Sequence, residues 1–427
     1  MELINNELYC KVKEAIAAFS RIGEVRSIKP WGNGHINDTF LLCTDDKKYI
    51  LQRINDTVFC EPYKMMENID KVTSHIMKKV ADPERATLTV VKTNKGELLF
   101  KDSTKAYWRM YNFLENTVSR DRVESANDFY VCAKAFGRFQ NFLSDFPAEE
   151  LYEVIKDFHN TPKRFENLAL AVEKDVVGRV KLAMAEIAFA TERREFCKIL
   201  ENARLDGRLP TRVTHNDTKL NNILFDANDG HAVAVVDLDT VMPGYSVNDF
   251  GDAVRFGANT AAEDETDLSK VSLDLDLFSA FAKGFIEGCE GRLTDAEISL
   301  LPVGAMMMTL ECGIRFLTDY LEGDVYFKIH RDGHNLDRAR NQFALLADME
   351  QKNLYQFLIF YSQSGGILIT GYFGIIVSAM ISNLYYNRTY YYEIMDGANT
   401  HHIIFSKLIV YNVFSTAVMI IPPVIAY

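Results

Sequence analysis

Three oxygen-bearing side chains in the middle of the chain have the types and spacing that phosphoryl transfer requires. A loop carries Asp217 and, five residues later, Asn222, while Asp237 ends an apolar run further on. An Asp at the first loop position can orient an attacking hydroxyl and accept its proton, and the other two side chains can share Mg²⁺. Lys219 is placed to contact γ-phosphate oxygens. The spacing therefore predicts a general base, a metal site and a phosphate-binding cation.

A hairpin must position these groups. Residues 222–225 and 232–236 are short apolar runs joined by a turn-rich segment, which predicts two strands. Asp and Asn residues in such a hairpin commonly do no more than shape turns. Turn chemistry does not explain the loop, the ribbon and the terminal carboxylate together, so we interpret the stretch as catalytic.

Two other triplets imitate protein-kinase signatures, in which H-R-D-x-x-x-x-N precedes D-F-G. The loop His330-Arg331-Asp332 lacks the Asn, because Asp337 stands in its place. The triplet Asp249-Phe250-Gly251 follows Pro-Gly and not a strand. We therefore expect Asp249 to cap or brace the segment that begins there, and we assign the metal to Asp237.

The composition is that of a globular protein with a sizeable core. The 427 residues are 48% hydrophobic and 25% charged, which is enough for two or three domains. A formal net charge of -12 argues against nucleic acid or an anionic membrane as the main partner. Seven cysteines without zinc spacing or a disulfide framework, and an N-terminus without signal-peptide features, favour the cytoplasm.

Residues 1–115 read as a small sheet with one inserted helix, which we interpret as an N-terminal lobe. Pro62 at a first helical position and apolar residues at helical spacing predict the helix at 62–80. Polar residues follow the last strand and form a natural hinge, in which we assign Glu115 to the nucleotide site. The predicted strands are 24–29, 39–44, 48–54, 87–93, 97–100 and 105–113.

A glycine-rich turn joins the first two strands. Gly32, Asn33 and Gly34 would let backbone amides approach a phosphate, although most such turns only connect strands. With the catalytic ribbon downstream, we interpret this turn as covering the nucleotide. His35 is either a substrate contact or an exposed turn residue, and the sequence leaves both open.

The third strand lacks the lysine that a kinase usually directs at the α- and β-phosphates. Arg53 is the cation on this strand that could substitute for it, with Glu67 as a partner. Strand alternation leaves open whether Gln52 or Arg53 faces the nucleotide.

Residues 116–352 read as a mainly helical lobe, and the remainder as a separate tail. Arg315 lies among apolar residues of a helix, so it needs an anionic or hydroxylated partner, or a structural salt bridge. Residues 353–427 contain two uncharged runs, 354–387 and 408–427, each long enough to span a bilayer. They predict a two-helix membrane hairpin, and the alternative is an apolar tail that packs on the body.

Across residues 22–352 the chain resembles the aminoglycoside phosphotransferase/choline kinase family of protein-kinase-like small-molecule kinases. The segments GNGHINDTF, YILQRIN, THNDTKLNNILFD and VVDLDTVMPG carry the resemblance. It implies an α+β, two-lobe fold that uses ATP and Mg²⁺. It also implies Asp217 as the base, Asn222 and Asp237 as metal ligands, and Asp239 as a further metal contact.

Other segments, among them DFHNTPKRF and NDFGDAVRFGANT, resemble family members that phosphorylate the anomeric hydroxyl of N-acetylhexosamines (GlcNAc or GalNAc). This implies a sugar pocket formed by His35, Asp217, Phe256, Arg315 and Tyr326. Two alternatives stay open. One is a kinase of the same fold that acts on choline, an amino acid or an aminoglycoside, and the other is a membrane-tethered pseudokinase, because the nucleotide lysine is absent.

Overall fold

The computed structural model describes residues 6–32, 36–120 and 122–354. They fall within one compact unit, residues 1–358. The predicted membrane hairpin in residues 353–427 lies almost wholly outside the described residues. Within them, one helix is long and apolar enough to cross a bilayer, namely α10 (Asp295–Glu322), and 89% of its apolar window is buried, as in the core helix of a soluble protein.

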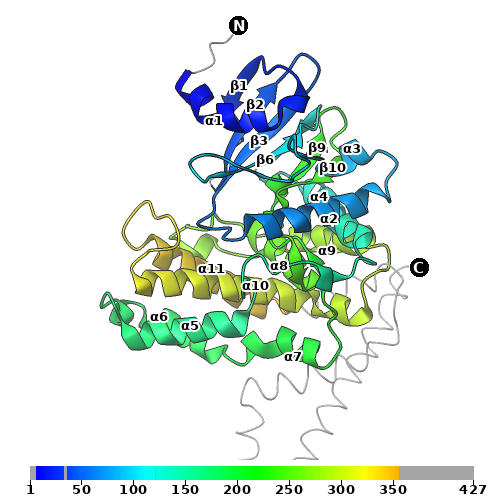
Figure 1. Cartoon of the computed structure of the whole chain (residues 1–427). Helices are drawn as coiled ribbons and strands as arrows, with labels where there is room; N and C mark the ends of the chain where they lie inside the picture. The colour runs from blue at the N-terminus through cyan, green and yellow to red at the C-terminus, as the bar shows by residue number, and fades with distance from the viewer. Residues whose placement is uncertain (1–5, 33–35, 121, 355–427) are drawn as a thin grey trace, which may run out of the picture. The chain divides into compact units, whose positions relative to one another are not determined.

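The N-terminal lobe is built on an antiparallel sheet of strand order β1-β2-β3-β6-β4, with β5 paired to β6 (Figure 1). Strand β3 agrees with the predicted bounds, whereas the predicted strands at 87–93 and 97–100 shrink to two residues each. The strands are β1 (Ser27–Pro30), β2 (Asp38–Cys43), β3 (Lys48–Ile54), β4 (Val90–Val91), β5 (Phe100–Lys101) and β6 (Tyr107–Asn112).

The two faces of this sheet belong to different cores. On one face, Leu51 and Met110 pack with Val12 of α1 (Asn6–Ala18) and with Phe19, which follows this helix. Side chains alternate along a strand, so the neighbours Gln52 and Tyr111 point to the opposite face. That face meets α2 (Pro62–Met77), the predicted helix, which begins at Pro62 and buries its apolar stripe. The sheet therefore presents one side to the remainder of the molecule.

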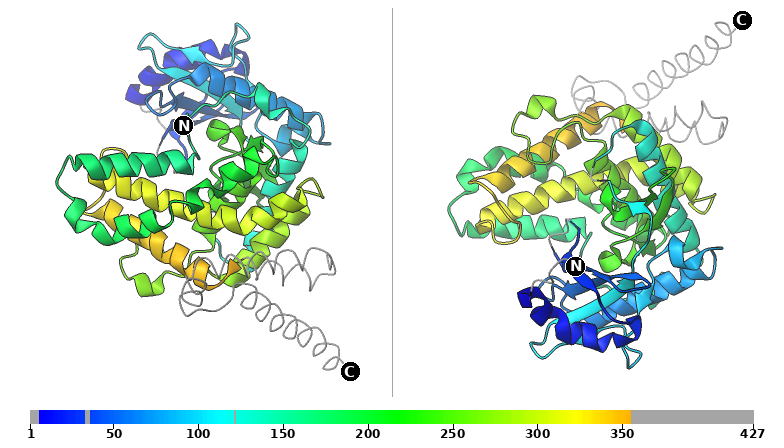
Figure 2. Two further views of the ribbon diagram at one scale, coloured as in Figure 1. Left: turned by 90° about the horizontal axis from the view of Figure 1, so that it is seen from below. Right: turned by 90° about the horizontal axis from the view of Figure 1, so that it is seen from above.

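The second lobe is helical, as predicted, and its centre is α10. The helices α5 (Thr161–Lys174), α8 (Ser246–Gly257) and α11 (His334–Gln351) all pack against α10, and both views of Figure 2 show α11 running beside it. The remaining helices are α3 (Pro83–Ala86), α4 (Ala126–Phe142), α6 (Met184–Glu192), α7 (Ile199–Leu205) and α9 (Leu275–Gly288).

Short strands at the junction of the lobes form the predicted ribbon. Strands β9 (Ile223–Asp226) and β10 (Ala232–Val235) pair in antiparallel fashion, and β7 (Thr117–Val118), from the predicted hinge, joins β9. A second antiparallel pair is formed by β8 (Arg212–Thr214) and β11 (Met242–Gly244). In the sequence, β8 precedes the ribbon and β11 follows it. The loops that leave β8 and β10 carry the candidate catalytic residues.

Candidate active site

The loop after β8 is held by a buried carboxylate on α8. Asp249 accepts hydrogen bonds from the backbone N–H groups of His215 (2.9 Å) and Asn216 (2.8 Å). Asn216 has a φ of 65°, a left-handed conformation that Asn tolerates better than most residues. Asp249 was expected to cap or brace the segment that begins at this residue. It instead braces the loop after β8 and so fixes the backbone on which Asp217 stands.

Asp217 lies directly beside two of its predicted partners. The Asn222 side-chain amide donates to the Asp217 Oδ2 (3.1 Å) and to its backbone carbonyl (2.8 Å), and Lys219 Nζ lies 2.6 Å from Oδ1. Burial alone would lower the pKa of Lys219, but the charges of Asp217 and Asp252 raise it above its ordinary value. Lys219 is therefore a cation beside the candidate base.

Asp237 has the surroundings of a metal ligand. Its backbone is left-handed (φ 59°), and the neighbouring Val236 N–H donates to the carbonyl of Asn222 (2.9 Å), which ties the two candidate ligands together. The side chain keeps exposed surface, and within the described residues it has no hydrogen bond or ion pair. Partial desolvation, followed by the charges of Asp239 and Asp217, raises the pKa of Asp237 to about 6. An accessible carboxylate under this repulsion suits a divalent cation.

Asp239 is paired with a cation of the protein itself, Arg109. It forms a buried ion pair with Arg109 of β6, at 2.5 Å from Nη1 to Oδ1 and 2.8 Å from Nη2 to Oδ2. The Asn37 amide also donates to Oδ2 (2.7 Å), and Arg109 Nε donates to Gln52 Oε1 (2.9 Å). This network joins the glycine-rich turn, the sheet and the loop after β10.

The other nucleotide candidates lie around this network. Arg53 points outward, is about half exposed and pairs with Asp38 (3.4 Å), whereas its neighbour Gln52 faces Arg109 in the strand register. Glu115 lies in the hinge and pairs with Lys48 (2.9 Å). Gly32 is exposed with a φ of 76°. Asn33, Gly34 and His35 are outside the described residues, and Glu67 is exposed on α2.

Two of the predicted sugar contacts come together. The Arg315 guanidinium, on α10, lies 6.0 Å from the ring centre of Tyr326 and 5.7 Å from that of Phe158. The sequence predicted an anionic or hydroxylated partner for Arg315, or a structural salt bridge. Within the described residues Arg315 forms no salt bridge and packs on aromatic rings, one of which belongs to the hydroxylated residue Tyr326. Tyr326 is 69% exposed, and Phe256, at the end of α8, is 43% exposed.

A cavity of about 210 Å³ lies beside the catalytic loop. Its wall includes Asn216, next to Asp217, and Phe158, which contacts Arg315. The wall also includes His159 and Asn248, which sequence reasoning missed together with Arg109. His159 lies in the quoted segment DFHNTPKRF, but neither its periodicity nor its spacing marked it as a site residue.

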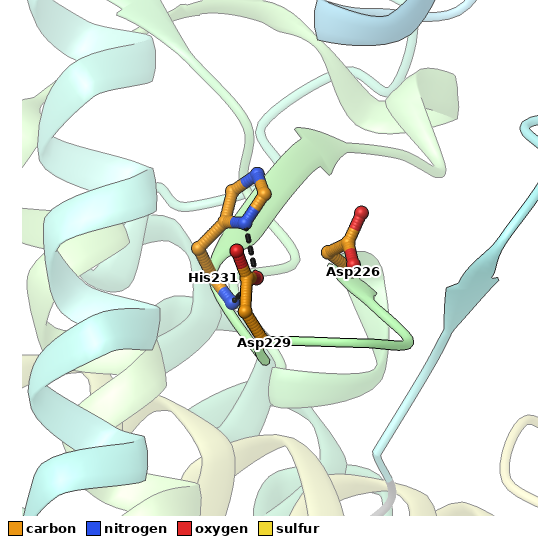
Figure 3. Close-up of side chains that lie close together, drawn as sticks. All are labelled: Asp226, Asp229 and His231. Atoms are coloured by element: carbon orange, nitrogen blue, oxygen red, sulfur yellow. Dashed lines mark hydrogen bonds and ion pairs between the residues drawn. The ribbon is translucent and has the colours of Figure 1, made fainter.

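A second carboxylate group lies on the turn between β9 and β10. Figure 3 shows Asp226, Asp229 and His231 close together, with His231 bonded to Asp229. Asp226 also pairs with Arg85 and accepts from the backbone N–H of Asn228 (2.8 Å). Asp229 and His231 are exposed and Asp226 is half-buried. The three residues shape and anchor the turn, and we assign no metal to them.

Comparisons with known proteins identify the family and the fold. A sequence model of the phosphotransferase enzyme family matches residues 27–272, which is more than half of the chain. Three solved structures share the fold over most of this chain. The microcompartment-associated aminopropanol kinase has 16% identity and a TM-score of 0.54, with 81% of this chain and 98% of that one covered.

The other two structures are an amicoumacin kinase in complex with AMP-PNP, Ca²⁺ and Ami, and the choline kinase of Cryptosporidium parvum. The first has 13% identity and a TM-score of 0.53, and covers 82% of this chain and 96% of that one. The second has 12% identity and a TM-score of 0.52, and covers 81% and 97%. At these identities the likeness shows the kinase-like α+β fold.

Proposed function

The chain belongs to the phosphotransferase enzyme family, and we propose that it is an ATP- and Mg²⁺-dependent kinase that phosphorylates the anomeric hydroxyl of GlcNAc or GalNAc. One observation carries the chemistry: the Asp217 carboxylate lies within 3.1 Å of both the Asn222 amide and Lys219 Nζ, near the accessible carboxylate of Asp237. This is the set of groups that positions an alcohol against a triphosphate.

Asp217 is the general base of this proposal. Its carboxylate accepts the proton of the anomeric hydroxyl, the sugar oxygen bonds to the γ-phosphorus, and the bond to the bridging oxygen breaks to release ADP. Asn222 holds one carboxylate oxygen and Lys219 the other, so both fix the direction in which Asp217 meets the hydroxyl.

The negative charge of the triphosphate must be balanced by cations. The protein's own candidates are Lys219 and Arg109. Asn222 and Asp237 would hold Mg²⁺, which neutralises phosphate charge when bound. Lys219 adds a positive charge beside the base. We assign the role of the absent strand lysine to Arg109, which lies opposite Gln52 in the sheet and pairs with Asp239 in the loop after β10. We assign Asp239 to Arg109 more than to the metal, since its Oδ2 accepts from Arg109 and its Oδ1 lies 2.5 Å from the same guanidinium, where it makes an ion pair without a hydrogen bond.

The choice of a sugar rests on the segments that resemble N-acetylhexosamine kinases and on the cavity beside Asn216. Arg315 does not line this cavity, but it packs against Phe158, which does, and against the Tyr326 ring. We assign Arg315 and Tyr326 to the sugar with Phe256 and His35. A small amino alcohol is the competing class of acceptor, because an aminopropanol kinase and a choline kinase share this fold.

An acceptor panel separates these classes. ADP release is measured with the full chain, Mg-ATP and either GlcNAc, GalNAc, choline, ethanolamine or kanamycin. We expect turnover with an N-acetylhexosamine and background rates with the amines. Turnover with choline or kanamycin and none with the hexosamines would overturn the sugar assignment. Failure to bind Mg-ATP at all would support the pseudokinase interpretation.

A further inference from the structure

A second carboxylate of α8 contacts the catalytic loop and takes no part in the proposed proton transfer. Asp252 is 9% exposed, and its Oδ2 accepts the backbone N–H of Thr218 (3.1 Å), the residue between Asp217 and Lys219. We propose that Asp252 is a positioning residue that acts through Lys219 and holds this cation in place for the γ-phosphate of ATP. The inference rests on the proposed function, which assigns Lys219 to the phosphate, and deepens it.

Asp252 completes a set of side chains that fix the backbone of this loop. The N–H groups of the two residues before Asp217 are accepted by Asp249, and the N–H of Asp217 itself donates to Nδ1 of His215 (3.2 Å). The next N–H belongs to Thr218 and donates to Asp252, while the Thr218 hydroxyl donates to the Asp249 carbonyl (2.6 Å). Helix α8 therefore holds the residue from which the chain continues into the lysine.

Charge is the second link between Asp252 and Lys219. Lys219 Nζ lies 2.6 Å from the Asp217 carboxylate. Burial favours the neutral amine, but the charges of Asp217 and then Asp252 outweigh it and raise the pKa of Lys219. Two carboxylates thus attract the same cation, and without Asp252 the lysine would be drawn toward the candidate base alone.

Asp252 is itself fixed by a buried arginine one turn further along α8. Arg255 is 6% exposed, and its Nη2 donates to Oδ1 of Asp252 (3.1 Å). Its Nη1 donates to Glu263 (2.8 Å) and to Gln342 of α11 (3.3 Å). Because Arg255 occupies one oxygen of Asp252 and Thr218 the other, the carboxylate cannot turn without losing a hydrogen bond. This rigidity suits a positioning residue.

The test is a double-mutant cycle on kcat in the full chain. Asp252→Asn removes the charge and keeps the volume, and it leaves Arg255 paired with Glu263. Lys219→Met removes the amine and keeps an unbranched apolar side chain, and the third variant combines the two changes. ADP release gives kcat, KM for Mg-ATP and KM for the acceptor that the panel identifies, and thermal unfolding gives Tm.

Asp348→Asn is the matched control, because Asp348 of α11 has the same kind of contacts away from the catalytic loop. It accepts the backbone N–H of Leu273 (2.7 Å) and pairs with Lys352, one turn further along its own helix (2.8 Å). We expect this variant to lower Tm and to keep kcat within about twofold of the wild type.

We expect Asp252→Asn to lower kcat by about tenfold and to leave both KM values within about twofold, because Asp252 positions a group that acts in the transition state. Lys219→Met should lower kcat by about 10²-fold. In the Lys219→Met background, Asp252→Asn should change kcat by less than about twofold, since the side chain through which it acts is gone. A residue that only supported the fold would lower kcat by the same factor in both backgrounds.

Equal factors in the two backgrounds would overturn the inference and leave the proposed function intact, as would wild-type kcat in Asp252→Asn. Wild-type kcat in Lys219→Met would instead show that the proposed function assigns Lys219 wrongly, and the inference would fail with it.

If Asp252→Asn is too unstable to assay, Arg255→Lys takes its place in the cycle. A lysine keeps the charge but lacks the fork that contacts Asp252 and Glu263 together. We expect kcat to fall by about threefold or more in the otherwise wild-type chain and by less than about twofold in the Lys219→Met background. The same loss in both backgrounds would overturn the inference.

Discussion

The buried pair Arg109–Asp239 connects the sheet to the catalytic segment, so its removal should affect stability and nucleotide binding together. Arg109→Met leaves Asp239 charged, buried and unpaired, which should cost about 3–5 kcal/mol of stability and raise KM for Mg-ATP. The double variant with Asp239→Asn should cost less than the sum of the two single changes. Urea unfolding and ADP release on the three variants check this, and strictly additive losses would contradict it.

The pKa of Asp237 leads to a pH dependence of metal binding. Because that pKa is raised to about 6, the carboxylate is protonated below this pH and loses its affinity for Mg²⁺. In the absence of nucleotide, the increase in Tm caused by Mg²⁺ should reach its maximum at pH 7–8. The apparent affinity for Mg²⁺ should fall by about tenfold for each pH unit below 6. Asp237→Asn is the control and should show no Mg²⁺ response. A response that is flat from pH 5 to 8 would contradict the assignment.

At the residue scale, sequence spacing identified the site residues that share one loop. It missed the residue whose role depends on how two strands are paired. Asp217, Lys219 and Asn222 share one loop, so their spacing alone brings them together. Arg109 is a single cation in an apolar strand, and its importance follows from lying opposite Gln52, a pairing that no local pattern shows. Arg53 was the apparent substitute for the lysine because strand alternation alone does not tell the two faces apart.

Helices α8 and α10 approach so closely that two glycines form the contact. A Cβ on Gly251 would overlap the backbone of Gly304, so neither position has room for a side chain. Gly251→Ala should therefore destabilise the protein by about 1–3 kcal/mol or more and displace Asp249, the brace of the catalytic loop. Lys283→Ala, on an exposed position of α9, is the matched control and should stay near wild type. Equal Tm values for the two variants would show that α8 has room to shift.

At the element scale, helices could be predicted where the apolar periodicity was strong and the residues at the helix ends were typical of helix ends. Pro62 and the apolar stripe defined α2, and Thr294 with Glu297 forms a capping box at the start of α10. The two short strands β4 and β5 were overestimated, because only two residues of each are in register with β6, and the residues flanking β4 add one hydrogen bond to it, from Asn112 N–H to the Thr89 carbonyl. Pairing, more than propensity, decided their length.

At the scale of the whole molecule, residues 1–358 form a compact unit that contains every described site residue. A chain ending at Leu358 should therefore keep kcat/KM within about twofold of the full chain. We also propose that the apolar residues 354–427 associate with membranes, so the full chain should sediment with vesicles and the shortened chain should not. Loss of activity on shortening would show that the tail completes the enzyme, and equal sedimentation would contradict the membrane proposal.

The central claim is that Asp217 accepts the proton of the attacking alcohol, and the most direct test is the turnover of Asp217→Asn. Steady-state ADP release with GlcNAc and Mg-ATP gives kcat, and Mg-ATP binding is measured on the same preparation. We expect kcat to fall by about 10²–10⁴-fold while the Kd for Mg-ATP stays within about twofold, because the base acts in the transition state and not on the bound nucleotide. Turnover of Asp217→Asn close to that of the wild type would contradict the role assigned to this residue.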